Sequence, residues 1–243
     1  MNKLYVVGIG PGAYEKMTIE AAQALKNSDV IIGYTVYVDL VKEHFPGKEF
    51  MTTPMKKEVE RCQMAFEEAI KGKTVSMICS GDAGVYGMAG LMYEVGVNYP
   101  QVELEIIPGV TAATGGAAVL GAPLIHDFCL ISLSDLLTPW EKIETRLLEA
   151  SKADFVICLY NPSSKKRHDY LEKACNLMME YKAPDTVCGI VENIGREGES
   201  MKVLTLEELK TTKVDMFTTV FVGNSQTKNI GGKMVTPRGY KNV

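Results

Sequence analysis

The sequence predicts an α/β protein with two αβα lobes, and three observations lead to this prediction. Short apolar segments alternate with segments of helical periodicity along the whole chain of 243 residues, as in a sheet that is covered by helices. Nearly every apolar segment ends in a loop with glycine or proline, which is typical of buried strands in a parallel sheet. The alternation starts again after Gly121-Ala122-Pro123. We therefore expect an N-terminal α/β domain at residues 1–120, a C-terminal α/β domain at 121–243, and a ligand cleft between them.

The first half contains four apolar segments with the length of buried strands, at residues 4–9, 29–32, 74–79 and 104–107. Thr18 is a suitable N-cap for a helix that starts with Ile19. Three further segments have helical periodicity or composition, at residues 58–71, 89–97 and 111–120.

The second half repeats this order. Its apolar, strand-like segments are residues 128–133, 155–160, 186–191 and 218–222. Thr138-Pro139-Trp140-Glu141 predicts a capping box with proline at the first helical position, and a helix to about Ala150. Further helices are expected at 170–181 and 206–209.

Composition and charge exclude several classes of protein. The net charge of −4 argues against a nucleic-acid-binding protein, which would show a strong basic stripe. No apolar run reaches the ~18 residues of a membrane span, and the N-terminal residues lack the pattern of a signal peptide, so we expect a cytoplasmic protein without a membrane partner. The six cysteines lack metal-site spacing and fit small buried side chains. No motif predicts a metal site.

Four glycine- or proline-containing loops follow predicted strands, at residues 8–12, 80–84, 108–112 and 160–164. Ligands of open α/β sheets bind beyond the carboxyl ends of the strands, where glycine permits close backbone approach. A dinucleotide site fits poorly, because the first loop reads Gly8-Ile9-Gly10-Pro11-Gly12 and the second strand ends without a carboxylate for a ribose. A phosphate loop of the Gly-x-x-x-x-Gly-Lys-Ser/Thr type is absent from the sequence.

The chain resembles the tetrapyrrole methylases, the S-adenosylmethionine-dependent enzymes of sirohaem and cobalamin synthesis. The resemblance rests on motifs that occur in family order along essentially the whole chain: Val7-Gly8-Ile9-Gly10-Pro11-Gly12, Ser80-Gly81-Asp82-Ala83-Gly84-Val85-Tyr86-Gly87, Ile107-Pro108-Gly109-Val110-Thr111-Ala112, Tyr160-Asn161 and Val191-Glu192-Asn193. It implies two αβα domains, S-adenosylmethionine as the cofactor, an anionic tetrapyrrole substrate and a homodimer. The residues that it implies for cofactor binding are Pro11, Ser80, Gly81, Asp82, Val85, Thr111, Ala112, Asn161 and Asn193.

Within the family, the chain is most similar to the branch that methylates C-17 of precorrin-3B or cobalt-precorrin-3. The matching segments are Gly33-Tyr34-Thr35-Val36-Tyr37, residues 121–128, 132–140 and 160–165. The resemblance implies C-17 methylation with ring contraction in cobalamin biosynthesis. We favour the cobalt-containing route, because the sequence shows no sign of oxygen chemistry; the metal would arrive with the substrate. A sibling methylase for another ring position and a non-catalytic tetrapyrrole-binding protein remain alternatives.

Ring contraction requires a proton transfer, for which His126 with the adjacent Asp127 is the candidate acid–base group. The alternative is that His126 holds the linker through hydrogen bonds. Lys165, Lys166 and Arg167 precede a helix, where cations oppose the helix dipole, so they form either an anion site for substrate carboxylates or a solvated basic surface. Ser132, Ser134, Arg196 and Arg238 are further candidates for polar contacts with the substrate, and Tyr34 and Tyr37 either stack on the macrocycle or belong to the core.

Overall fold

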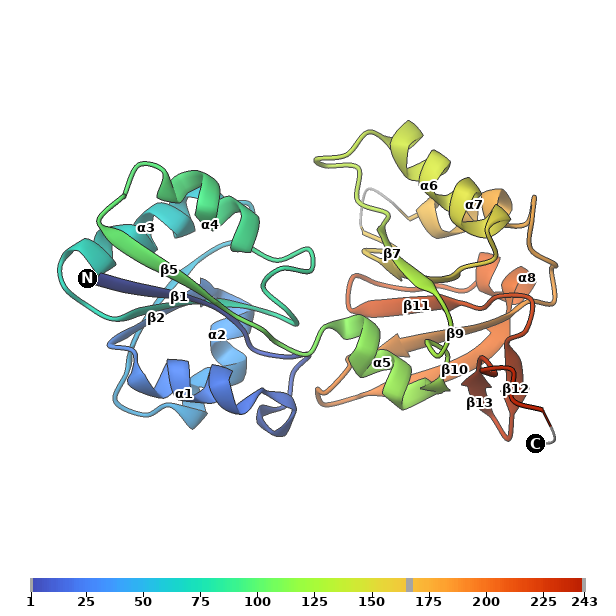
Figure 1. Ribbon diagram of the computed structural model, residues 1–243, viewed down its shortest axis with the longest axis horizontal. Helices are drawn as coiled ribbons and strands as arrows, with labels where there is room; N and C mark the ends of the chain where they lie inside the picture. Colours follow the sequence, from blue (N-terminus) through green and yellow to red (C-terminus); the bar gives the residue numbers. More distant parts are fainter. Residues whose placement is uncertain (1, 165–167, 242–243) are drawn as a thin grey trace. The chain divides into compact units, whose positions relative to one another are not determined.

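The computed structural model describes residues 2–164 and 168–241. Its internal contacts divide the chain into two compact units, Met1–Ala112 and Ala113–Val243, which Figure 1 colours along the sequence. The division falls between residues 112 and 113, whereas the sequence predicted it after residue 120. The reason is that helix α5 (Ala112–Leu120) packs on the second unit: a side chain at Gly116 would collide with Ile194 and Phe221.

The first unit is built on a five-stranded sheet in the order β3-β2-β4-β1-β5, and all of its paired strands are parallel. The strands are β1 (Asn2–Gly8), β2 (Val30–Tyr34), β3 (Glu49–Thr53), β4 (Val75–Cys79) and β5 (Val102–Ile107). This confirms the four strands predicted for the first half. Strand β3 was not predicted; it lies at an edge of the sheet and buries only its last residue, Thr53.

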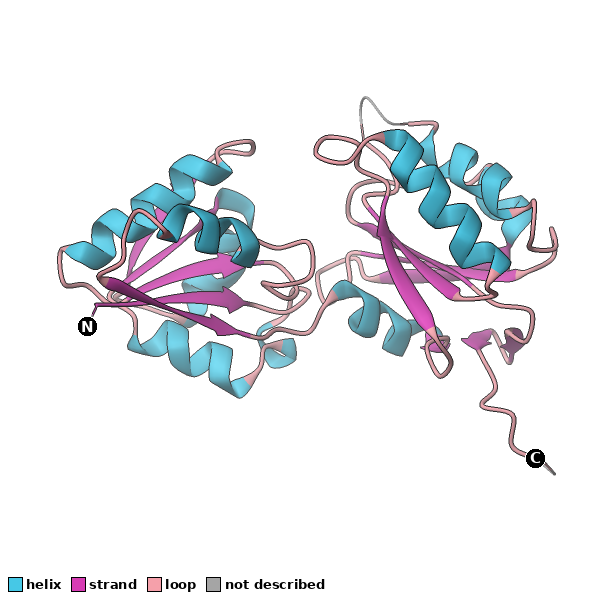
Figure 2. Ribbon diagram, turned by 45° about the horizontal axis from the view of Figure 1, so that its top comes forward, coloured by secondary structure: helices cyan, strands magenta, loops and turns pink. Residues whose placement is uncertain are grey.

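Helices cover both faces of this sheet (Figure 2). They are α1 (Ile19–Asn27), α2 (Thr35–Val41), α3 (Glu58–Ile70) and α4 (Ala89–Gly96), with short 3₁₀ turns η1 (Tyr14–Lys16) and η2 (Lys42–His44). Successive residues of β1 point to opposite faces: Leu4 and Val6 join the core under α3 and α4, and Val7 joins the core under α1 and α2. Thr18 caps α1 as predicted, because its hydroxyl accepts the Ala21 N–H at 3.0 Å.

The second unit has a mixed five-stranded sheet in the order β10-β9-β11-β8-β7. Its strands are β7 (Phe128–Ser132), β8 (Val156–Tyr160), β9 (Val187–Glu192), β10 (Ser200–Thr205) and β11 (Thr218–Val222). Only β7 and β8 pair in parallel; the other pairs are antiparallel. The prediction of parallel strands is therefore wrong for most of this sheet. Residues 193–199, which join β9 to β10, are too few for the crossover that a parallel pair needs.

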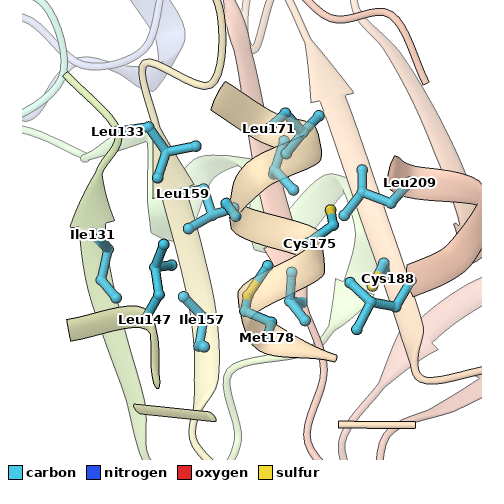
Figure 3. Close-up of a cluster of buried hydrophobic side chains, with 14 of the residues drawn as sticks. Ile131, Leu133, Leu147, Ile157, Leu159, Leu171, Cys175, Met178, Cys188 and Leu209 are labelled. Atoms are coloured by element: carbon cyan, nitrogen blue, oxygen red, sulfur yellow. The ribbon is translucent and has the colours of Figure 1, made fainter. Parts of the chain in front are cut away.

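Three helices, α6 (Trp140–Lys152), α7 (Tyr170–Met178) and α8 (Leu206–Lys210), pack on one face of the second sheet. Figure 3 shows their contact with the strands, where Leu159 of β8 and Cys188 of β9 meet Leu171 and Met178 of α7 in one buried cluster. Helix α5 lies on the other face, where Leu120 packs against Gly189. A small sheet of β12 (Lys228–Ile230), β13 (Lys233–Val235) and β6 (Gly121–Ala122) completes the unit.

The predicted capping box at Thr138 is not formed. Helix α6 begins at Trp140, its N-cap is Pro139, and no side chain caps it. The Pro139 carbonyl accepts the N–H groups of Lys142 and Ile143, so the helix starts one residue later than the motif suggested. In the part of the chain that the structure describes, no helix combines the length and the apolar character needed to cross a bilayer.

Candidate functional site

The glycine loops after β1, β4 and β5 meet at the carboxyl edge of the first sheet. Gly10 and Gly81 exchange two backbone hydrogen bonds, with N–O distances of 3.0 and 2.7 Å. A β-carbon on Gly109 would lie 2.2 Å from the Gly81 carbonyl oxygen and 2.5 Å from that of Gly8. Any side chain at Gly109 would therefore force the loops apart, and only glycine allows three strand ends to pack directly on one another.

Asp82 fixes the arrangement of two of these loops. Its Oδ1 accepts the N–H of Gly84 at 2.8 Å, within the loop that follows β4. Its Oδ2 accepts the N–H of Gly109 at 2.9 Å, in the loop that follows β5. Hydrogen bonds to a carboxylate are stronger than those between neutral groups, so Asp82 acts as a clamp between the two strand ends.

The structure brings the predicted cofactor residues of the first unit together. The β-carbon of a side chain at Gly81 would lie 3.6 Å from the Thr111 Cα and 3.8 Å from the Ala112 nitrogen, so the loops of β4 and β5 are adjacent there. Pro11 is buried directly after Gly10, which is bonded to Gly81. Ser80 and Val85 are half-buried in the loop that contains Gly81. These residues form one continuous edge.

Topology and charge indicate which kind of ligand this edge accepts. The neighbouring strands β1 and β4 are followed by helices on opposite faces, which marks the switch point where α/β sheets bind ligands. Within residues 8–13, 80–88 and 108–112, all of them described, Asp82 is the single charged side chain. The short 3₁₀ turn η1 follows the first loop, and α1 begins only at Ile19, so the loop does not lead directly into the α-helix N-terminus that a pyrophosphate site uses. Backbone groups and one carboxylate suit a neutral or cationic ligand better than a phosphate.

In the second unit, Ser132, Asn161 and Asn193 lie at the carboxyl ends of β7, β8 and β9. These ends share one edge, because β7 is parallel to β8, and both β8 and β9 run antiparallel to β11. The Asn161 side chain donates to the Ser132 hydroxyl at 3.0 Å. Asn161 and Asn193 both adopt left-handed backbone conformations, with φ of 52° and 51°, which asparagine tolerates better than most residues. Strained conformations of this kind concentrate at functional sites.

The structure does not bring His126, Asp127 and Arg238 to that edge. Half-buried His126 and exposed Asp127 precede β7 at its amino end, where the Asp127 carbonyl accepts the Val156 N–H. Asp127 and Ser132 are five positions apart along the chain, which corresponds to roughly 17 Å in a strand. Arg238 donates to the Ile125 carbonyl at 2.9 Å. Catalytic roles for His126 and Asp127 and a substrate role for Arg238 stay predictions.

Tyr34 ends β2 at the carboxyl edge of the first sheet, and its ring lies edge-on to Tyr37 at 5.3 Å between centroids. The buried Arg61 of α3 places its guanidinium carbon 5.9 Å from the Tyr34 ring centroid. Arg61 is not among the residues predicted from the sequence; the available signal was an arginine among the inward-facing positions of an amphipathic helix. Lys165, Lys166 and Arg167 lie outside the described residues.

The family model for Tetrapyrrole (Corrin/Porphyrin) Methylases matches residues 3–210. The chain belongs to the tetrapyrrole methylase family. This confirms the resemblance seen in its sequence. The chain is 48% identical over 238 residues to a Salmonella typhimurium protein named "Probable cobalt-factor III C(17)-methyltransferase", and the match covers 98% of this chain and 99% of that protein. It is 40% identical to the "Precorrin-3B C(17)-methyltransferase" of Sinorhizobium sp, with 98% and 96% covered.

Longer relatives exist as well. The chain is 46% identical to the "Cobalt-factor III methyltransferase" of Priestia megaterium over 99% of its own length, but it spans only 45% of that protein. Among solved structures, the crystal structure of the methyltransferase CobJ superimposes with a TM-score of 0.90 at 34% identity, and the match covers 98% of this chain and all of that one. The fold predicted from the sequence is thereby confirmed as that of the family.

Proposed function

We propose that this protein transfers a methyl group from S-adenosylmethionine to C-17 of cobalt-precorrin-3, with ring contraction, in cobalamin biosynthesis. The observation that supports it most is the joined edge of β1, β4 and β5, where the loops pack directly on one another and carry no cationic side chain and a single carboxylate, that of Asp82. The names of relatives that match nearly the full chain supply the reaction and the ring position.

The residues at this edge fit the cofactor, because a sulfonium carries positive charge and the edge offers no competing cation. Bound S-adenosylmethionine would supply an activated methyl group. Pro11, Ser80, Gly81, Thr111 and Ala112 would hold it. The protein's task is then to hold two partners in line and to exclude water, which lowers the barrier without a protein nucleophile. The predicted contributions of Val85, Asn161 and Asn193 belong to the same proposal.

The cobalt-containing form of the substrate is the better supported one. The relatives at 46% and 48% identity are named for cobalt-factor III, whereas the one at 40% is named for precorrin-3B. The described residues contain no group of three or more potential metal-ligating side chains, so we treat cobalt as part of the substrate. We further propose a homodimer in the cytoplasm, which light scattering and cell fractionation test.

The first experiment is a calorimetric titration of the protein with S-adenosylhomocysteine, the demethylated cofactor. We expect saturable binding of about one ligand per chain, and at 100 times the dissociation constant a stabilisation of about 2.7 kcal/mol in a thermal melt. Assays with cobalt-precorrin-3 and precorrin-3B follow, with product mass and methyl position as readouts. Methylation at another ring position would favour a sibling activity, and folded protein without cofactor binding would favour a tetrapyrrole-binding protein.

A further inference from the structure

A buried arginine lies at the carboxyl edge of the first sheet, outside the glycine loops. Arg61 belongs to the first turn of α3, directly after the connection from β3, and only 5% of it is exposed. Its Nε donates to the Thr53 hydroxyl at 2.8 Å, and its Nη2 donates to the Pro54 carbonyl at 3.1 Å. The side chain is thus anchored at the ends of β2 and β3, with the Tyr34 ring beside it.

The charge of Arg61 is not neutralised within the described part of the chain. No carboxylate there lies within ion-pair distance of the guanidinium, whose partners are a hydroxyl, a carbonyl and an aromatic ring. Nη1 has no hydrogen-bond partner among the described residues. It is nevertheless not a fully buried atom, because Ser151 Oγ is the one fully buried side-chain polar atom without a partner in that part of the chain. Nη1 therefore keeps access to solvent.

Burying a cation without a counter-ion costs folding free energy, and buried charges in proteins are therefore usually paired with an ion of opposite charge. Thr53 and Pro54 accept hydrogen bonds from Nε and Nη2 and so fix the orientation of the guanidinium. The N–H groups of Nη1 remain available as donors in that fixed orientation. Carboxylates suit a guanidinium because both are planar and can share paired hydrogen bonds. The observations therefore point to a carboxylate as the missing partner.

We infer that Arg61, with Tyr34 beside it, binds a peripheral carboxylate of the tetrapyrrole substrate and so orients the macrocycle relative to the cofactor. The inference rests on the proposed function. It gains support from position: along the edge, the order of strand ends is β3, β2, β4, β1, so Tyr34 lies one strand from the loop of β4. Strands are spaced ~4.8 Å apart, so a large planar ligand can reach both places.

The test uses the full chain and uroporphyrin III, a tetrapyrrole with eight carboxylates, as the binding probe in an absorbance titration. We expect Arg61→Met to weaken uroporphyrin binding by about tenfold or more, since it removes a charged hydrogen bond. Arg61→Lys keeps the charge but loses the fork and should weaken binding less. Arg146→Met, which removes an exposed cation from α6, is the matched control and should bind as the wild type does.

Titration of the same variants with S-adenosylhomocysteine separates the two proposals. We expect all of them to bind it as the wild type does, and a thermal melt shows whether Arg61→Met is folded. Unchanged uroporphyrin binding by folded Arg61→Met and Arg61→Lys would overturn the inference. If the wild type binds S-adenosylhomocysteine but no uroporphyrin, the carboxylate site is refuted while the cofactor site stands. Should the wild type bind neither ligand, the proposed function fails first.

Discussion

At the scale of single residues, Asp82 connects the sequence motif most directly to the geometry of the site. It was predicted to bind the cofactor, and the structure shows both of its carboxylate oxygens bonded to backbone N–H groups of two loops. Asp82 therefore holds together the strand ends at which the other candidate residues lie, and we expect it to act on cofactor binding through them.

We expect Asp82→Asn to weaken S-adenosylhomocysteine binding by about tenfold. One oxygen can still accept from Gly84, but the new amide group points a donor at the Gly109 N–H, and losing a charged hydrogen bond costs about 1.5–3 kcal/mol. Calorimetry measures the affinity. Asp185→Asn, in an exposed loop of the second unit, is the control and should bind normally. Equal affinities for the two variants would show that Asp82 does not organise the site.

The six cysteines are all free thiols; five are buried and Cys129 is half-buried, as expected for small hydrophobic side chains. Burial raises the pKa of Cys62 and Cys175 to about 12 and that of Cys79 and Cys129 to about 11, and it raises those of Cys158 and Cys188 as well. Since the thiolate is the reactive form, each of these thiols should be inert near neutral pH.

We therefore expect slow labelling of the native protein by a disulfide reagent at about pH 8, with Cys129 modified before the other five. Peptide mass spectrometry identifies the modified positions. In denaturant all six cysteines should react quickly. This control shows that the reagent is active and that all six thiols are detected. Fast labelling of a buried thiol in the native state would contradict the packing described for the sheets.

His126 is the candidate acid–base residue for ring contraction, and its mutation tests that role. Its place at the amino end of β7, next to the carbonyl that Arg238 binds, favours the structural alternative. We expect His126→Ala to lower thermal stability modestly and to change kcat for C-17 methylation by less than tenfold. General acid–base catalysis contributes typically 10²–10⁴-fold, so a loss of that size at unchanged cofactor affinity would establish the acid–base role instead.

At the scale of elements, the packing of the three loops depends on positions that leave no room for a side chain, of which Gly109 is the tightest. Gly109→Ala should abolish measurable S-adenosylhomocysteine binding and lower the melting temperature, because its β-carbon would overlap carbonyl oxygens of Gly8 and Gly81. Gly90→Ala is the matched control: it lies within α4 with no atom near its added carbon. That change should stabilise the protein by about 0.5–1 kcal/mol, since alanine is the better helix former. Retained binding by Gly109→Ala would refute the close packing of the loops.

Two strands at the edges of the sheets are not predicted by the hydrophobic pattern of the sequence. Strands β3 and β10 expose much of their surface, so their residues lack the continuous apolar run that identified the central strands. Helix α5 was predicted at residues 111–120, which agrees with the observed Ala112–Leu120 at its C-terminal end. The prediction assigned it to the first domain. Its small residues do not reveal which sheet they approach; contact of Gly116 with Ile194 and Phe221 decides it.

At the scale of the whole molecule, Lys182 ties distant parts of the second unit together. Its buried Nζ donates to the carbonyls of Phe155 and Gly223, both at 2.9 Å, and Asp154 lies 3.8 Å away. Burial lowers the pKa of Lys182 below its ordinary value of 10.5, against the opposing effect of Asp154. The unfolded chain therefore binds more protons than the folded protein between the folded pKa and 10.5, so stability rises with pH in that interval.

We expect the stability difference between the wild type and Lys182→Met to change in favour of the wild type as pH rises toward 10.5. At neutral pH the variant should be less stable by about 1–3 kcal/mol, because two carbonyls lose their donor. Denaturant unfolding at about pH 8 and 10.5 measures both effects. Lys213→Met, at an exposed lysine, should show neither. A difference independent of pH would mean that folding does not lower this pKa.

The sequence by itself determined the family, the α/β class, the central strands and the residues of the β1, β4 and β5 loops. It could do so because buried strands need apolar runs, and because close backbone packing needs glycine at fixed positions. The tertiary structure alone decided the mixed direction of the second sheet, the place of α5, the separation of His126 from Asn161, and the absence, among the described residues, of a carboxylate within ion-pair distance of Arg61. Those features depend on contacts between residues far apart in the chain, which no local pattern records.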